Sequence, residues 1–275
     1  MTDTTTVTAA TLAVPGALLH YEVRGAGPLI ALIGAPMDAA AFAPLADLLA
    51  TDHTVLTSDP RGANRSTIED RDADSTPEIR ADDLARLLTH LDAGPAVVLG
   101  SSGGAVTTLA LVQARPDLLH TAIAHEPPLI NLLDDRDEVR AATDDMCATY
   151  LGGDHLGAWR KFMANANIEL PPGVLEHMFG DDRDPKTLAG EHFWFAHELR
   201  PSTYWNPDLH VLRSSPVRIV AGIGDASTGQ ECDRTTTALA ARLGIEPTLF
   251  PGGHTGFVDD PQTFVVRLRA VLDEN

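Results

Sequence analysis

Short β-branched and aliphatic runs alternate with longer amphipathic runs in the first half of the chain and again towards its end. Such runs predict buried strands joined by helices, and their alternation indicates an α/β fold with a mostly parallel central sheet flanked by helices. The predicted strands are 18–23, 29–33, 54–58, 96–99, 121–124, 217–221 and 247–250. The predicted helices are 38–50, 77–91, 105–115, 234–243 and 261–272.

The strand pattern disappears between residues 129 and 213. Helical stretches fill this segment, and runs such as Gly152-Gly153 and Pro171-Pro172-Gly173 interrupt them. Most of the large aromatic residues of the chain also lie here. We therefore expect a core formed by residues 1–128 and 214–275, with residues 129–213 inserted as a helical cap.

The composition narrows the class of protein and its partners. Of the 275 residues, 44% are hydrophobic and 21% are charged, which is typical of a globular protein with a sizeable core. The 39 acidic residues outnumber the 20 basic ones, and the formal charge of −19 disfavours nucleic acid and anionic membrane surfaces as partners. No stretch approaches the roughly 20 apolar residues of a membrane-spanning helix, and residues 1–10 lack the features of a secretory signal. We expect a cytoplasmic protein, and a homodimer is compatible with the sequence.

A candidate nucleophile lies in the run Gly100-Ser101-Ser102-Gly103-Gly104, which fits the pattern G-x-S-x-G. The run follows a predicted strand and precedes a predicted helix, as the sharp turn of this motif requires. Glycines are needed beside the serine because the turn is strained and side chains there would collide with the strand or the helix. The pattern predicts that Ser102 presents its hydroxyl as a nucleophile above the sheet edge.

A serine hydroxyl needs a base to take its proton and a third group to orient that base. Among the 11 histidines, His254 is the best candidate base, because its glycine-rich loop follows the last predicted strand. Two carboxylates follow strands from which they could orient His254. Glu126 comes after the strand that follows the nucleophile helix, and Asp225 comes after the next strand of the sheet. Either residue keeps the chain order serine, acid, histidine.

Backbone N–H groups must stabilise the negative charge that develops on an attacked carbonyl oxygen. Gly103 supplies the N–H that directly follows the nucleophile. The loop after the 29–33 strand should supply the second N–H from Ala35, because Pro36 has none. Met37 lies in the same loop, and we expect it to form part of the pocket wall.

No metal or cofactor motif emerges from the chain. Cys147 and Cys232 have neither a C-x-x-C nor a zinc-type spacing, and the histidines show no H-E-x-x-H pattern. Gly222 and Gly224 follow a strand, but Ser227 replaces the third glycine of a dinucleotide-binding loop. The sequence therefore predicts neither a metal site nor a cofactor.

The chain resembles the α/β-hydrolase superfamily in its sheet-forming parts on both sides of the cap. Within that superfamily, the nucleophile run, His125-Glu126-Pro127 and Pro251-Gly252-Gly253-His254 resemble the zearalenone lactonases, which open the macrocyclic ester of a mycotoxin. The resemblance favours Glu126 over Asp225 as the acid, because the lactonases use the glutamate of this His-Glu pair. It also implies that Ala35 and Gly103 line the oxyanion hole and that Trp194 of the cap packs on the substrate ring.

Three positions depart from the lactonase pattern. That family typically has a serine after the nucleophile and a glycine in the first oxyanion position, where this chain has Gly103 and Ala35. The position of Asp225 is also occupied by an acid that the lactonases do not need. The resemblance thus supports the superfamily more strongly than the substrate, because caps set specificity on this fold.

The sequence as a whole predicts a hydrolase that cleaves a small hydrophobic carboxylic ester or lactone through an acyl-enzyme. An epoxide hydrolase or dehalogenase of this fold would carry a carboxylate at the position of Ser102. Two alternatives stay open: a cofactor-free perhydrolase or haloperoxidase of the same fold, and a ligand receptor on this fold with slow or no turnover.

Overall fold

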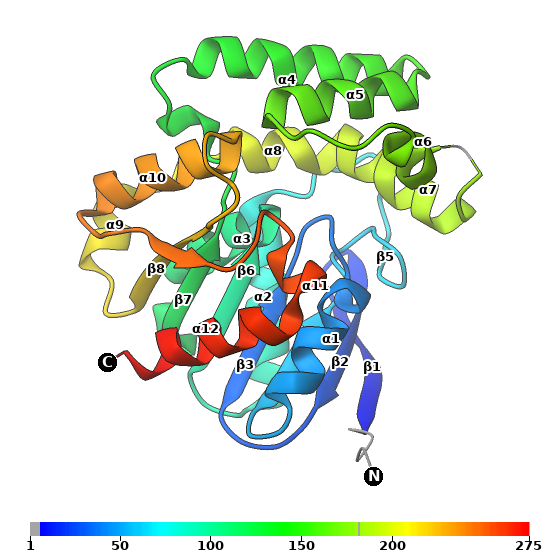
Figure 1. Ribbon diagram of the computed structural model, residues 1–275. Helices are drawn as coiled ribbons and strands as arrows, with labels where there is room; N and C mark the ends of the chain where they lie inside the picture. The colour runs from blue at the N-terminus through cyan, green and yellow to red at the C-terminus, as the bar shows by residue number, and fades with distance from the viewer. Residues whose placement is uncertain (1–5, 181, 275) are drawn as a thin grey trace.

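A central sheet organises the computed structural model, which describes residues 6–180 and 182–274 (Figure 1). The strand order is β1-β2-β4-β3-β6-β7-β8-β9, with β5 paired to β2 beside this path. The strands are β1 (Val7–Val14), β2 (Ala17–Arg24), β3 (Leu29–Ile33), β4 (Thr54–Ser58), β5 (Thr67–Ile68), β6 (Ala96–Ser101), β7 (Leu119–His125), β8 (Arg218–Gly224) and β9 (Thr248–Phe250). From β4 to β9 all neighbours are parallel, whereas β2 pairs antiparallel with β1, β4 and β5. The predicted α/β fold with a mostly parallel sheet is confirmed.

Helices cover both faces of the sheet and one of its ends (Figure 1). They are α1 (Ala39–Leu49), α2 (Pro77–Leu91), α3 (Gly103–Ala114), α4 (Arg136–Leu151), α5 (His155–Ala166), α6 (Val174–Phe179), α7 (Pro185–Phe193), α8 (Leu199–Thr203), α9 (Leu209–Ser214), α10 (Glu231–Leu243), α11 (Gly256–Asp259) and α12 (Pro261–Asp273). Short 3₁₀ turns occupy Pro116–Leu118 and Ile130–Leu132, and a π-helical turn, Trp194–Glu198, joins α7 to α8. Among the described residues, no helix is long and apolar enough to cross a membrane.

Strand β1 is not among the strands predicted from the sequence. Most of its side chains are exposed or half-buried, so it lacks the apolar run that marks a core strand. Its backbone instead pairs with β2 over its whole length, from Val7 opposite Arg24 to Val14 opposite Ala17. Backbone hydrogen bonding to a neighbouring strand therefore determines this element. Residues 1–5, part of the start for which no secretory signal is expected, lie outside the described residues.

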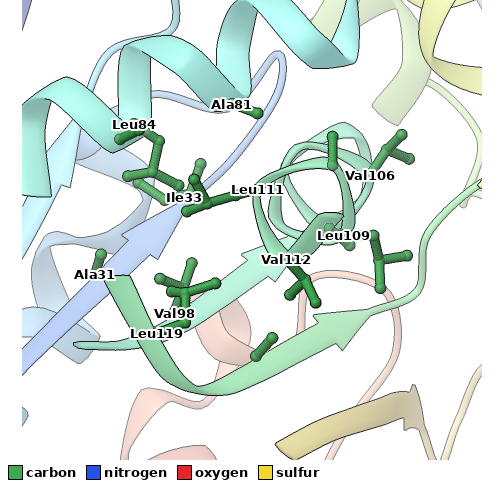
Figure 2. Packing of buried hydrophobic residues seen from close by; sticks show 14 of the residues in the cluster. Ala31, Ile33, Ala81, Leu84, Val98, Val106, Leu109, Leu111, Val112 and Leu119 are labelled. Atoms are coloured by element: carbon green, nitrogen blue, oxygen red, sulfur yellow. The ribbon is translucent and has the colours of Figure 1, made fainter. Parts of the chain in front are cut away.

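Separate hydrophobic clusters cover the two faces of the sheet, as the alternation along β3 illustrates. Ile30 and Leu32 pack in the cluster that includes side chains of α1, α11 and α12. Ala31 and Ile33 pack on the opposite face with α2 and α3, and Figure 2 shows both pointing towards those helices beside Val98. A strand buried on both faces is typical of a central parallel sheet. Packing from both sides thus holds the strand ends in place, and the candidate site lies at these ends.

Helices α4 to α8, between β7 and β8, form a layer across one end of the sheet (Figure 1). This layer has its own hydrophobic cluster, formed by Met146, Cys147, Tyr150, Ala158, Trp159, Trp194, Phe195 and Leu199. The last part of the insertion is different, because Trp205 and Leu212 pack in the core cluster with α2 and α3. The segment expected to form the cap therefore ends with residues that pack on the core.

A buried arginine connects this helical layer to the core. Arg80 of α2 donates from Nη2 to Ser202 Oγ in α8 at 2.8 Å and from Nε to Thr107 Oγ1 in α3 at 3.0 Å. Thr107 Oγ1 donates in turn to Gly103 O at 3.0 Å. Since a buried guanidinium is stable only with partners, these bonds fix α8 relative to the first turn of α3.

Candidate active site

Ser102 occupies the turn between β6 and α3, with backbone angles φ 57° and ψ −124° that a non-glycine residue rarely adopts. The turn requires glycine on both sides. A Cβ on Gly100 would lie 2.3 Å from Gly104 O, and one on Gly104 would lie 2.2 Å from Ile33 O. The Ser102 side chain is half-buried, and its N–H donates to His125 O at 3.0 Å. The local sequence thus produces a sharp turn that holds the serine at the carboxyl end of β6.

His254 and Glu126 are joined by a short hydrogen bond between Nδ1 and Oε2, 2.5 Å long. Glu126 directly follows β7 at φ 53°, and its carboxylate is completely buried. The other carboxylate oxygen, Oε1, accepts from the N–H of Gly224 at 2.8 Å. The His254 ring is 22% exposed, so one side of the ring can face a ligand. The ends of β7 and β8 therefore hold the glutamate rigidly behind the imidazole.

The charge of Glu126 is stabilised in spite of its burial. Burial alone would raise the pKa of this carboxyl, but the hydrogen bond and charge of His254 lower the pKa to about 2. Glu126 is therefore ionised at neutral pH. An ionised carboxylate behind Nδ1 favours the imidazole tautomer with its proton on Nδ1 and its lone pair on Nε2.

Asp225, the alternative acid, lies at a different place. It is exposed, its N–H donates to Phe250 O at 2.8 Å, and its Oδ1 accepts from the N–H of Gly252 at 2.9 Å. These contacts support the loop that carries His254 without touching the ring. The structure thus brings Glu126, and not Asp225, to the imidazole.

The two expected oxyanion donors lie side by side. A Cβ on Gly103 would lie 2.8 Å from Ala35 O and 3.0 Å from Ala35 Cβ, so the loop after β3 packs directly on the start of α3. Among the hydrogen bonds of the described residues, none uses the N–H of Ala35 or of Gly103. Both donors are therefore free to bind a ligand oxygen. Met37 is half-buried and packs at the margin of the cluster with α1 and α12.

Trp194 packs mainly within the helical layer between β7 and β8. Its ring lies 5.6 Å from that of Trp159 and 4.7 Å from that of Phe195, and the residue is only 8% exposed. Most of its surface is used in the aromatic cluster of this layer. The contact expected between Trp194 and a substrate ring stays a prediction.

Helix α10 brings two groups to the site that the sequence pattern does not identify. Burial raises the pKa of Glu231 to about 7, although Arg234 and His254 act to lower it. The Sγ of Cys232 lies close to both Glu126 and His254. No short motif marks either residue, because each reaches the site only through the packing of α10 against β8.

Buried His125, next to Glu126, leads to a prediction about stability and pH. Its ring is fully buried among Phe250, Phe257 and Phe264, and burial lowers its pKa from 6.5 to about 4. Because the unfolded chain then binds one more proton than the native chain, stability should fall by about 1.4 kcal/mol per pH unit as pH decreases from 6.5 to 4. Urea unfolding across this range should show that extra slope in the wild type and not in His125→Gln. Equal slopes in the two proteins would contradict the burial of a neutral histidine.

The strand order, the serine turn and the buried glutamate behind a histidine together define an α/β hydrolase. The sequence model of the Alpha/beta hydrolase family matches residues 19–268, and the chain belongs to this family. The chain is 35% identical over 276 residues to the uncharacterized hydrolase YraK of Bacillus subtilis, covering 98% of this chain and 97% of YraK. It is 26% identical over 269 residues to a zearalenone hydrolase of Bionectria ochroleuca, covering 94% of this chain and 95% of that enzyme. The resemblance to the zearalenone-hydrolysing enzymes is thus confirmed at the level of homology.

Solved structures confirm the fold. An alpha/beta hydrolase from Sphaerobacter thermophilus superposes with a TM-score of 0.68 at 21% identity, covering 94% of this chain and all of that chain (100%). At this level of identity the likeness concerns the fold, while the chemistry depends on the site.

Proposed function

We propose that this enzyme hydrolyses carboxylic esters or lactones through an acyl-enzyme, with Ser102 as the nucleophile, His254 as the base and Glu126 as the acid. The observation that carries the proposal is the 2.5 Å bond from His254 Nδ1 to the buried Glu126, together with a serine held at a strained turn. A serine supports acyl transfer because it forms an ester with the acyl group and releases it to water.

The residues would act in sequence. The Nδ1–H of His254 donates a hydrogen bond to the ionised Glu126, so the Nε2 lone pair faces Ser102 and accepts its proton as Oγ attacks the carbonyl carbon. The negative charge on the carbonyl oxygen is stabilised by the N–H groups of Ala35 and Gly103. Nε2–H then protonates the leaving alcohol, and a water activated by the same nitrogen releases the acid. Among the described residues no hydrogen bond joins Ser102 Oγ to His254, and this contact is expected to form when substrate binds.

The substrate we propose is a hydrophobic ester or lactone of moderate size. Two features support this choice: the aromatic cluster in the cap, and the homology to enzymes named for zearalenone, a macrocyclic lactone. The serine at the turn between β6 and α3 also favours ester chemistry over epoxide opening, which on this fold would use a carboxylate at that position.

A substrate series tests the proposal directly. Turnover of p-nitrophenyl esters should rise from acetate to longer acyl chains, and zearalenone should gain one water on conversion, as seen by mass spectrometry. A steady fall in kcat/KM beyond acetate would overturn the choice of a hydrophobic substrate. Peroxide-dependent turnover of a carboxylic acid without ester hydrolysis would favour a perhydrolase. If the protein neither turns over esters nor reacts with a serine-directed phosphonate, the hydrolase proposal fails and a receptor becomes the better interpretation.

A further inference from the structure

Cys232 lies beside the pair formed by Glu126 and His254. A carboxylate oxygen of Glu126, a ring nitrogen of His254 and the Cys232 Sγ all lie within 4.8 Å of one another. These residues come from the end of β7, the first turn of α10 and the loop after β9, so only the tertiary structure brings them together. The proposed hydrolysis uses Glu126 and His254 and gives Cys232 no role.

Carboxylate, imidazole and thiolate are the side-chain donors that bind zinc in proteins, and a thiolate also favours softer ions such as cadmium. The carboxylate is completely buried, whereas the His254 ring is 22% exposed and Cys232 is half-buried. The three donors thus converge beside the proposed triad, and among Glu126 and His254 it is the His254 ring that is open to solvent. Three protein ligands leave a fourth tetrahedral position for water or a substrate group.

We propose that Cys232, Glu126 and His254 form a site for a thiophilic divalent cation such as Zn²⁺ or Cd²⁺, and that its occupation inactivates the enzyme. The inactivation part rests on the proposed function, whereas the binding part does not. The nitrogen that faces Glu126 is Nδ1, so coordination replaces the hydrogen bond to Oε2 with two bonds to the cation.

The consequence for catalysis follows from the imidazole tautomer. A neutral imidazole that coordinates a cation through Nδ1 must carry its proton on Nε2. Nε2 then has no lone pair with which to accept the Ser102 proton. The balance is one cation bound and one proton released to solvent, because the Cys232 thiol becomes a thiolate while the ring proton moves from Nδ1 to Nε2.

Binding can be measured independently of turnover. Cd²⁺ is titrated into the metal-free protein, and the ultraviolet charge-transfer band of a Cd–thiolate bond is followed together with calorimetry and proton release. We expect one Cd²⁺ and one proton per chain in the wild type, in Ser102→Ala and in Cys147→Ala, the last being a matched control because Cys147 is buried in the cap cluster. Cys232→Ala should lose the band and bind more than about 100-fold more weakly, beyond the 10–100-fold that loss of an outer-shell partner causes.

Activity then tests the inactivation. Ester hydrolysis by the wild type and Cys147→Ala should fall in proportion to Cd²⁺ occupancy and return with EDTA, whereas Cys232→Ala should keep its own metal-free rate at the same Cd²⁺ concentrations. A band that persists in Cys232→Ala, or no binding to the wild type, would overturn the site. Binding at Cys232 without loss of turnover would overturn the inactivation alone. Absence of any esterase activity would overturn the proposed function and still leave the Cd²⁺ binding result interpretable.

Discussion

Replacement of Ser102 by alanine should lower kcat for ester hydrolysis by about 10⁴- to 10⁶-fold while the fold is retained. The reason is that the other hydroxyl at this turn, that of Ser101, is fully buried and cannot form the acyl-enzyme, whereas alanine removes only one half-buried oxygen. The oxyanion donors would still bind the substrate carbonyl, which accounts for a residual rate above that in water. Steady-state kinetics and intact-mass labelling with a serine-directed phosphonate measure the loss.

Ser101→Ala provides the matched control. Ser101 is fully buried, and its Oγ lies 3.3 Å from His125 Nδ1, away from the proposed chemistry. Loss of that hydrogen bond should lower stability by about 1 kcal/mol and leave phosphonate labelling intact. Labelling of Ser102→Ala to the same extent as the wild type would show that the nucleophile lies elsewhere.

Glu126→Gln should lower kcat by about 10⁴-fold, the effect of losing the orienting acid in a serine triad. The N–H of Gly224 needs an acceptor, so the amide oxygen should replace Oε1 and the amide NH₂ should face His254. An NH₂ group facing Nδ1 forces the ring proton to Nε2, which removes the base. KM should change far less than kcat, because Glu126 is completely buried and does not reach substrate.

Asp225→Asn is the comparison that decides between the two acids. An asparagine oxygen can still accept from the N–H of Gly252, and the side chain is exposed, so kcat should stay within about tenfold of the wild type. Circular dichroism and unfolding midpoints should show that both variants are folded. A large loss of kcat in Asp225→Asn with a small loss of kcat in Glu126→Gln would identify Asp225, at the end of β8, as the acid and contradict the proposed triad.

Much of the core follows from local signals in the sequence. β3 and β4 have the predicted bounds, because continuous apolar runs between turn residues leave a central strand little alternative. The start of α1 is equally local, since Asp38 caps it by accepting from the N–H groups of Ala40 and Ala41. The serine turn is marked by its glycines, since Gly100 and Gly104 lie where a Cβ would overlap backbone oxygens.

Contacts between distant segments decided the rest. β1 carries little hydrophobic signal and is extended because β2 offers it hydrogen-bonding partners. The sequence left Glu126 and Asp225 as alternatives, since both follow a strand at the same end of the sheet, and only the distance to the imidazole separates them. Cys232 has no motif at all and reaches this pair through the packing of α10. The sequence by itself thus determined the central strands of the sheet, the serine turn and the candidate groups, because these depend on neighbours along the chain. The tertiary structure decided which groups meet, because that depends on packing between residues more than 100 positions apart, as in the bond between Glu126 and His254.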